Sequence, residues 1–215
     1  MKYIVANWKA NKNLNEAYEW LEIFLKQLAP KPNISVVICP PLPLLIPLKE
    51  KLVGRNNIFL GAQNISNFEE GQYTGETTVK TLKGLVSYAI VGHSERRRYF
   101  LEEDDILSQK VQLASKYAIT PIYCIRGIND KIPPGVSMIA YEPVDAIGTG
   151  QNESPVNVIT LKKQLGVRED SIFLYGGSVD PKNSQTYLEL PEIAGLLVGT
   201  TSLDPVNFAA IVNQA

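Results

Sequence analysis

Residues 88–97 read YAIVGHSERR, a short apolar run that ends at a glycine and is followed at once by polar and charged side chains. Seven further apolar runs of similar length occur along the chain, at residues 3–6, 35–39, 58–61, 121–124, 137–141, 172–175 and 195–198. All eight runs are apolar nearly throughout rather than alternating, which is typical of strands buried on both faces of a parallel sheet. The sequence therefore predicts eight buried parallel strands.

Stretches with helical spacing of apolar residues lie between most of these runs, at residues 13–28, 44–52, 104–116, 156–165, 183–190 and 205–213. The first stretch has a candidate N-cap, Asn13, with Glu16 three residues later. Strands and helices that alternate eight times predict a closed α/β barrel of the (β/α)8 type, which we expect to be one domain over residues 1–215. A doubly wound open sheet is the alternative, but no GxGxxG motif opens a first helix.

One connection departs from this alternation. Between the strands predicted at 121–124 and 137–141, residues 126–136 read RGINDKIPPGV, with two prolines and two glycines. A parallel crossover needs about a dozen residues and usually contains a helix. We therefore expect the fifth crossover helix to be shortened or replaced by a loop, which agrees with a chain of 215 residues where such barrels typically have ~250.

Composition and charge argue against several classes of function. Lys and Arg (21) nearly cancel Asp and Glu (22), whereas a nucleic-acid groove normally shows as a clustered cationic excess. No apolar run approaches the ~20 residues that span a bilayer, and the first residues do not resemble a signal peptide. A single histidine excludes a multi-histidine metal site. We expect a cytoplasmic protein without a nucleic-acid or membrane partner.

Polar residues that follow the predicted strands are the candidate site, because chemistry in such a barrel sits at the C-terminal ends of the strands. Asn7 and Lys9 follow the first strand, His93 follows the fourth, and Glu142 follows the sixth. Glycine-bearing loops follow the last three strands and can present main-chain N–H groups to a phosphate. A base, a neutral electrophile and a cation beside such loops suit proton abstraction next to the carbonyl of a phosphorylated sugar.

Seven segments, most of them at the ends of predicted strands, carry a resemblance to a known family. In chain order they are NWKAN, CPP, GAQN, YTGE, VGHSERR, YEP followed by AIGTG, and YGGSV. Together they resemble the triosephosphate isomerases over nearly the whole chain. The resemblance implies a TIM barrel that interconverts dihydroxyacetone phosphate and D-glyceraldehyde 3-phosphate, as in glycolysis and gluconeogenesis. It also implies an aldose–ketose isomerase that works through an enediolate without a cofactor or metal.

The resemblance implies a role for each residue at the strand ends. Glu142 is implied to be the base that moves the proton between the two carbons, and His93 the neutral imidazole that polarises the carbonyl. Lys9 is similar to the family's electrostatic stabiliser of the enediolate, and Asn7 helps to orient the substrate. Glu95 resembles the carboxylate that holds this lysine in place.

The resemblance also implies how the substrate is enclosed. Main-chain N–H groups of Gly148, Ser178, Gly199 and Thr200 are implied to bind the phosphate. The lid that closes over the substrate and excludes water is implied to consist of Pro143, Val144, Asp145, Ala146, Ile147, Gly148, Thr149 and Gly150.

Two departures from the family pattern concern these parts. Asp145 stands where most of the family has a tryptophan, and we expect it to alter the kinetics of the lid without abolishing activity. Thr200 stands where the family has a second glycine, and a β-branched residue tolerates a positive φ poorly. We expect the phosphate site to be intact in kind. The main-chain geometry at Thr200 stays open at this point.

Tyr73, Thr74 and Gly75 resemble the tip of a long loop that reaches into a partner subunit in this family. A homodimer is the expected assembly. A tetramer stays open as an alternative, because a shortened fifth connection exposes a different surface.

Other notable residues have plain structural explanations. Cys39 and Cys124 are too few for a disulfide framework, and because each ends a predicted strand we expect both to be buried. The arginines at 96–98 are expected to form ion pairs at the surface. Gln63, in the GAQN segment, is expected to be structural, at the start of the interface loop.

Two other functions remain as alternatives. A related phosphosugar barrel, such as an aldolase or a phosphoribosyl isomerase, is the first. An aldolase would need a Schiff-base lysine at a strand end, and Lys9 is the lysine that the sequence places there. A non-catalytic barrel that binds phosphorylated sugars is the second, and the joint presence of Lys9, His93 and Glu142 argues against it.

Overall fold

The computed structural model describes residues 1–29, 31–143 and 152–215. In these ranges the strands pair in parallel, each with the next in the chain, and close into a barrel because β8 pairs with β1. The strands are β1 (Lys2–Asn7), β2 (Ile34–Cys39), β3 (Ile58–Ala62), β4 (Tyr88–Val91), β5 (Thr120–Ile125), β6 (Met138–Tyr141), β7 (Ile172–Tyr175) and β8 (Gly195–Val198). The barrel that the sequence predicts is confirmed, and each strand lies within one residue of its predicted bounds.

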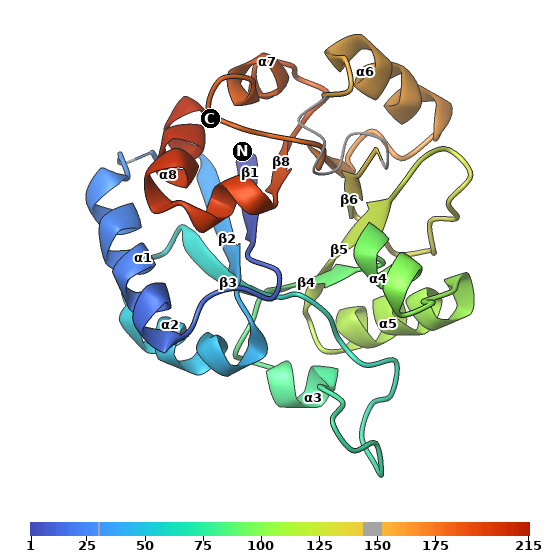
Figure 1. The fold of residues 1–215 in the computed structure, drawn as a ribbon. Helices are drawn as coiled ribbons and strands as arrows, with labels where there is room; N and C mark the ends of the chain where they lie inside the picture. The colour runs from blue at the N-terminus through green and yellow to red at the C-terminus, as the bar shows by residue number, and fades with distance from the viewer. Residues whose placement is uncertain (30, 144–151) are drawn as a thin grey trace.

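Helices surround the strands, as Figure 1 shows. They are α1 (Leu14–Gln27), α2 (Leu45–Lys51), α3 (Val79–Leu82), α4 (Ser94–Tyr99), α5 (Asp104–Lys116), α6 (Pro155–Gln164), α7 (Ser184–Leu188) and α8 (Pro205–Gln214), with 3-10 turns η1 (Leu42–Leu44) and η2 (Thr200–Leu203). All six predicted helices form. The sequence did not predict α3 and α4, because helices of four and six residues are too short to show a periodic apolar face. Within the described ranges no helix is long and apolar enough to cross a membrane.

The first helix begins where the sequence predicts it. The Asn13 side chain accepts a hydrogen bond of 3.1 Å from the N–H of Glu16, and the Glu16 carboxylate accepts one of 2.7 Å from the N–H of Asn13. This capping box satisfies two N–H groups that the helix start leaves without partners. It also fixes where the chain turns after the end of β1.

Two layers of apolar side chains fill the fold. An inner set packs inside the barrel and includes Val5, Ile90, Met138 and Leu174. An outer set lies between the strands and the helices that cover them. Because side chains alternate across a strand, each strand contributes to both layers, which explains runs that are apolar nearly throughout.

Closure of the barrel depends on a glycine. Gly195 pairs with Tyr3 where β8 meets β1. A Cβ atom built on Gly195 would overlap the main-chain oxygen of Tyr3. Only a residue without a side chain lets these two strands approach to pairing distance.

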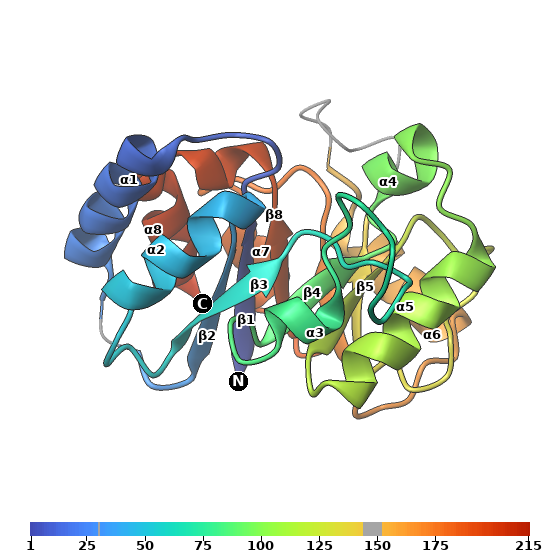
Figure 2. The ribbon, with the colours of Figure 1, turned by 90° about the horizontal axis from the view of Figure 1, so that it is seen from below.

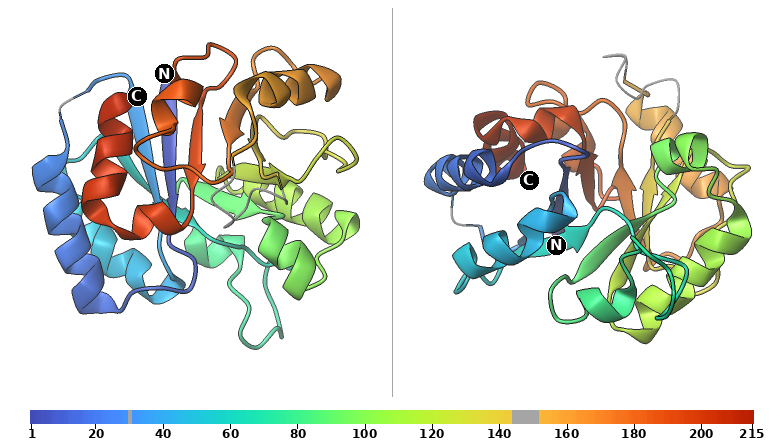
Figure 3. Two further views of the ribbon diagram at one scale, coloured as in Figure 1. Left: turned by 45° about the horizontal axis from the view of Figure 1, so that its top comes forward. Right: turned by 60° about the horizontal axis from the view of Figure 1, so that its bottom comes forward.

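The connection between β5 and β6 is a loop, as the sequence predicts. Residues 126–137 contain no helix or strand, and the segment is the yellow-green loop in Figure 3. The Arg126 guanidinium and main-chain N–H donate hydrogen bonds of 2.6 to 3.0 Å to the Asp130 carboxylate. The Tyr123 hydroxyl donates to the main-chain oxygen of Lys131 over 2.9 Å. These contacts order the loop without a helix.

Both cysteines are buried and unpaired, as predicted. Burial raises the pKa of the Cys39 thiol. Burial, with a further contribution from the nearby Glu142 carboxylate, raises the pKa of Cys124 well above its ordinary value. Both side chains pack inside the barrel as small apolar groups.

Candidate active site

A cavity of about 270 Å³ opens at the C-terminal ends of the strands, the upper side of the barrel in Figure 2. Residues that the sequence singles out line much of it: Asn7, Lys9, His93, Glu142, Ser178, Gly199 and Thr200. The rest of the lining is Gly176, Gly177 and Val179, which belong to the YGGSV segment, with Leu197 and Thr201; the sequence analysis assigned none of these five an individual role. Side chains from the first, fourth and sixth strand ends therefore meet in one place, although they are far apart in the chain.

Alternation along the strands decides which side chains face this cavity. In β6, Ala140 faces the barrel interior and Tyr141 packs on the outer side. The next residue, Glu142, continues the interior row and is only 2% exposed. In β1 the same period places Val5 inside the barrel and Asn7 above it, at the cavity.

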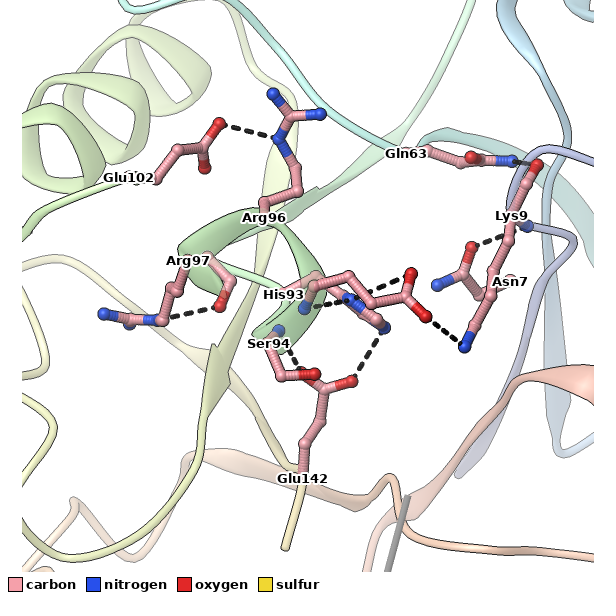
Figure 4. A network of polar contacts seen from close by, with 11 residues as sticks. Asn7, Lys9, Gln63, His93, Ser94, Arg96, Arg97, Glu102 and Glu142 are labelled. Carbon is pink, nitrogen blue, oxygen red and sulfur yellow. Dashed lines mark hydrogen bonds and ion pairs between the residues drawn. The ribbon is translucent and has the colours of Figure 1, made fainter. Parts of the chain in front are cut away.

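Glu142 is held by two contacts from the end of β4, which Figure 4 shows. Its Oε1 lies 2.8 Å from Nε2 of His93, and its Oε2 accepts a hydrogen bond of 2.9 Å from the main-chain N–H of Ser94. Both side chains of the pair are buried, so water competes little for their polar atoms. The sequence analysis did not assign a role to Ser94, although its place in the VGHSERR segment was a signal.

The contacts of His93 define its neutral tautomer. The main-chain N–H of Glu95 donates to Nδ1 of His93 over 3.2 Å. A ring nitrogen that accepts a hydrogen bond carries no proton, so the neutral ring has its proton on Nε2, which faces Glu142. The nearest Glu95 carboxylate oxygen lies 3.7 Å from Nδ1, beyond hydrogen-bond distance. His93 also caps α4, so the helix start orients the ring.

Lys9 reaches the cavity from the end of β1. Its Nζ lies 2.6 Å from Oε1 of Glu95, and its main-chain N–H donates to Oδ1 of Asn7 over 3.1 Å. The main chain at Lys9 has a φ of 52°, a left-handed conformation that costs a non-glycine residue roughly 1–2 kcal/mol. Trp8, immediately before it, is fully buried against Trp20 of α1, with ring centroids 4.8 Å apart. That packing anchors the turn that presents Lys9 to the cavity.

Among known protein families, the sequence model described as triosephosphate isomerase matches residues 2–132 and 129–215. The chain belongs to the triosephosphate isomerase family. It is 38% identical to the triosephosphate isomerase of Carboxydothermus hydrogenoformans, over 98% of this chain and 97% of that protein. It is 35% identical to that of Aquifex aeolicus, over 98% of both chains, and 36% identical to that of Thermus thermophilus, over 99% and 98%.

These triosephosphate isomerases contain residues that this chain lacks. Their alignments run over 243 to 246 positions, although the chain has 215 residues. The two parts of the family match meet at residues 129–132, inside the loop between β5 and β6. The break in the match therefore coincides with the connection that has no helix.

The glycine-bearing loops after β7 and β8, which resemble the family's phosphate-binding loops, lie side by side. The Thr201 hydroxyl donates to the main-chain oxygen of Val179 over 2.7 Å and joins the two loops. The non-glycine residues with a left-handed φ, among those the structure describes, are Lys9, Lys12, Leu101 and Ala118. Thr200 is not one of them and begins the 3-10 turn η2, so its β-branched side chain imposes no strain of the kind considered from the sequence.

Gln63 has a more specific role than the sequence analysis assigned. Its side-chain amide donates hydrogen bonds to the main-chain oxygens of Lys9, over 2.8 Å, and Cys39, over 2.9 Å. The end of β3 thereby supports the turn that carries Lys9. The signal in the sequence was the GAQN segment, which resembles the family at this strand end.

The prediction of surface ion pairs for residues 96–98 is wrong about the position of Arg97, which is buried, although its guanidinium lies 3.6 Å from the Asp104 carboxylate. The Arg97 side chain donates to the main-chain oxygens of Gly92, over 2.9 Å, and Cys124, over 3.2 Å. A planar guanidinium with several donors can satisfy main-chain oxygens from two adjacent strand ends, which a sequence pattern does not reveal. Arg96 does form an ion pair, at 2.6 Å from Glu102, which is itself buried.

Several predicted site residues lie outside the part of the chain that the structure describes. Within the lid, Pro143 is described and directly follows Glu142. The other predicted lid residues, Val144, Asp145, Ala146, Ile147, Gly148, Thr149 and Gly150, are outside the described ranges. In the described ranges no three His, Cys, Asp or Glu side chains are arranged to hold a metal ion.

Proposed function

We propose that Glu142, His93, Lys9 and Asn7 carry out the reaction of the triosephosphate isomerase family in this chain. That reaction interconverts dihydroxyacetone phosphate and D-glyceraldehyde 3-phosphate. The observation that carries the assignment is the buried contact of 2.8 Å between His93 and Glu142, at the wall of a cavity that Lys9 also lines. It brings together a base, a hydrogen-bond donor and a cation within reach of one small substrate.

Glu142 is the base of this proposal. Its carboxylate removes the proton from the carbon next to the carbonyl and returns it to the neighbouring carbon, which converts the ketose to the aldose. In the structure both oxygens of the Glu142 carboxylate have partners, the His93 ring and the main-chain N–H of Ser94. A bound substrate must separate Glu142 from these partners, so the observed arrangement is the resting position of the base.

His93 and Lys9 stabilise the charge that forms on oxygen. The Nε2 proton of His93 faces Glu142 in the resting arrangement and can be donated to the carbonyl oxygen of the substrate once the carboxylate has moved. The Lys9 ammonium provides positive charge and is held by the Glu95 carboxylate, while Asn7 accepts a hydrogen bond from the main-chain N–H of Lys9. Preorganised donors of this kind act where the negative charge of the enediolate develops.

The phosphate is bound between the loops after β7 and β8 in this proposal. Ser178, Gly199 and Thr200 line the cavity and supply main-chain N–H groups, with Gly148 as a fourth donor from the sequence pattern. A Cβ atom on Gly199 would lie 3.8 Å from Nζ of Lys9, so the ammonium is next to this loop. Residues 143–150 serve as the lid that excludes water.

We propose further that residues 1–215 form one catalytic domain that acts in the cytoplasm as a homodimer. Two free cysteines suit a reducing compartment. The loop between β3 and α3 extends beyond the barrel at the bottom of Figure 1. It carries Phe68 and Tyr73, whose rings stack 3.7 Å apart and are about two-fifths exposed. A partner subunit would cover these aromatic side chains; a tetramer is the second possibility.

A coupled assay of D-glyceraldehyde 3-phosphate turnover tests the function. Replacing Glu142 with Gln keeps the shape and removes the base, so turnover should fall about 10²–10⁴-fold. Glu22→Gln, on the exposed face of α1, is the matched control and should turn over like the wild type. A folded wild type that binds phosphoglycolate but shows no turnover would favour the non-catalytic barrel. Sedimentation at micromolar concentration tests the dimer, and a stable active monomer would refute it.

A further inference from the structure

Two stacked tyrosines lie behind the loop that follows β7. Tyr175 is the last residue of β7, and Tyr187 lies on α7. Their rings stack with centroids 4.1 Å apart and planes 19° apart. Both residues are buried, at 0% and 2% exposed, so each hydroxyl needs a partner inside the protein.

The main chain of Glu153 provides partners for both hydroxyls. The N–H of Glu153 donates to the Tyr175 hydroxyl over 3.0 Å, and the Tyr187 hydroxyl donates to the Glu153 main-chain oxygen over 2.6 Å. The two tyrosines therefore bind opposite ends of one residue's main chain. Glu153 immediately precedes Ser154, which caps α6.

Burial raises the pKa of Tyr175 and of Tyr187. Stacking joins the two rings. The main chain of Glu153 joins the two hydroxyls, because its N–H donates to Tyr175 and its oxygen accepts from Tyr187.

The stacked rings and their hydrogen bonds to Glu153 support the loop after β7. Gly176, Gly177 and Ser178 directly follow Tyr175 and line the cavity. A Cβ atom on Gly177 would overlap the Tyr175 hydroxyl, so the loop rests directly on this group. A shift of the Tyr175 ring would therefore move the main chain of residues 176–178.

We propose that Tyr187 is a positioning residue for the phosphate-binding loop: its ring and hydroxyl fix Tyr175 and Glu153, so that residues 176–178 keep the geometry that binds the substrate's phosphate. The inference rests on the proposed function, which assigns this loop to the phosphate. Tyr187 lies outside the cavity lining and acts through Tyr175. Its contribution is rigidity, because a stacked ring and buried hydrogen bonds to Glu153 define one arrangement.

The variant that tests this is Tyr187→Phe, which keeps the stacked ring and removes the hydroxyl. The main-chain oxygen of Glu153 then loses its donor. We expect KM and the Kd of phosphoglycolate to rise about tenfold, with kcat changed less than twofold, because binding of the phosphate is shared by ground and transition states. Exchange of the Glu153 amide hydrogen should accelerate by about tenfold.

Tyr123→Phe is the matched control. It also removes a buried hydroxyl that donates to a main-chain oxygen, that of Lys131, in the loop between β5 and β6. Its melting temperature should fall about as much as that of Tyr187→Phe, while its phosphoglycolate Kd and the exchange at Glu153 should match the wild type.

Each outcome decides between the hypotheses. If Tyr187→Phe loses stability like the control but keeps wild-type KM and Kd, Tyr187 only packs and the proposal is overturned. Unchanged exchange of the Glu153 amide would also overturn it. Amide exchange requires no turnover, so it separates the two proposals. If the wild type is inactive, the proposed function is refuted. If amide exchange at Glu153 and residues 176–178 is nevertheless faster in Tyr187→Phe, the positioning role is retained.

Discussion

The side-chain amide of Gln63 donates a hydrogen bond of 2.8 Å to the main-chain oxygen of Lys9. The main chain of Lys9 has a left-handed φ of 52°, which an isolated lysine would rarely adopt. A side chain at the end of β3 thus stabilises the conformation that places the Lys9 ammonium at the cavity. This relationship yields the first prediction.

Replacing Gln63 with Met keeps the length of the side chain and removes both hydrogen bonds. The turn at Lys9 should relax, and kcat/KM should fall about tenfold, the equivalent of about 1.4 kcal/mol. Steady-state kinetics measures this. Gln109→Met, on an exposed face of α5, is the control and should leave kcat/KM unchanged. Wild-type kinetics for Gln63→Met would show that Lys9 holds its conformation without this support.

Gly195→Ala should destabilise the barrel where it closes. The new Cβ atom would overlap the Tyr3 oxygen, and separating β8 from β1 should cost about 3 kcal/mol. Gly127→Ala is the matched control, because no atom lies within 4 Å of its added Cβ, and it should leave stability unchanged or raise it by up to about 1 kcal/mol. Urea unfolding compares the two. Equal urea midpoints for the two variants would mean that β8 can move away from β1 without loss of stability.

A buried ion cluster should make Lys110 important for stability. Its Nζ lies 2.6 Å from Oε1 of Glu102, and both residues are buried. Lys110→Met leaves the Glu102 carboxylate with less compensation and should cost about 3 kcal/mol. Lys26→Met removes a cation from the exposed pair with Glu22 and should cost less than about 0.5 kcal/mol. If the two variants lose similar amounts of stability in thermal unfolding, burial of the Lys110–Glu102 pair does not matter and the prediction is wrong.

The Arg126–Asp130 pair should make the loop between β5 and β6 sensitive to acid. Burial alone would raise the pKa of Asp130, but hydrogen bonds from the side chain and main chain of Arg126 outweigh it and hold the pKa below 3.8. Because the pKa of Asp130 is lower in the folded than in the unfolded state, its ionised carboxylate stabilises the fold above pH 3.8. This stabilisation is lost as the pH falls through the pKa of Asp130 in the folded state.

Asp130→Asn should therefore be less stable than the wild type at pH 6, by about 1 kcal/mol, and the difference should shrink below pH 3.8. Urea midpoints across this pH range measure it. The bond from Arg168 also lowers the pKa of Asp170, but this pair is exposed, so Asp170→Asn should differ from the wild type less than Asp130→Asn does at pH 6. A difference that grows toward low pH would reverse the assigned sign.

The regular elements followed from local patterns. The strands were predictable because each buries both faces, and α1 because its N-cap pair and apolar spacing are local features. The short α4 was not, because six residues rich in arginine show no apolar face. Its formation depends on His93, which caps it locally, and on the packing of Arg97 against the end of the adjacent strand β5, which is a tertiary contact.

The sequence by itself determined the barrel, the loop in place of the fifth crossover helix, and the strand ends that carry Asn7, Lys9, His93 and Glu142. Those features depend on apolar periodicity and on the order of strands, which the chain encodes locally. Only the tertiary structure decided how Glu142 is held by Ser94, how Gln63 supports Lys9, and how Tyr187 binds the main chain of Glu153. Each of these bonds joins residues more than 30 positions apart, and its partner is defined only when closure of the barrel brings those positions together.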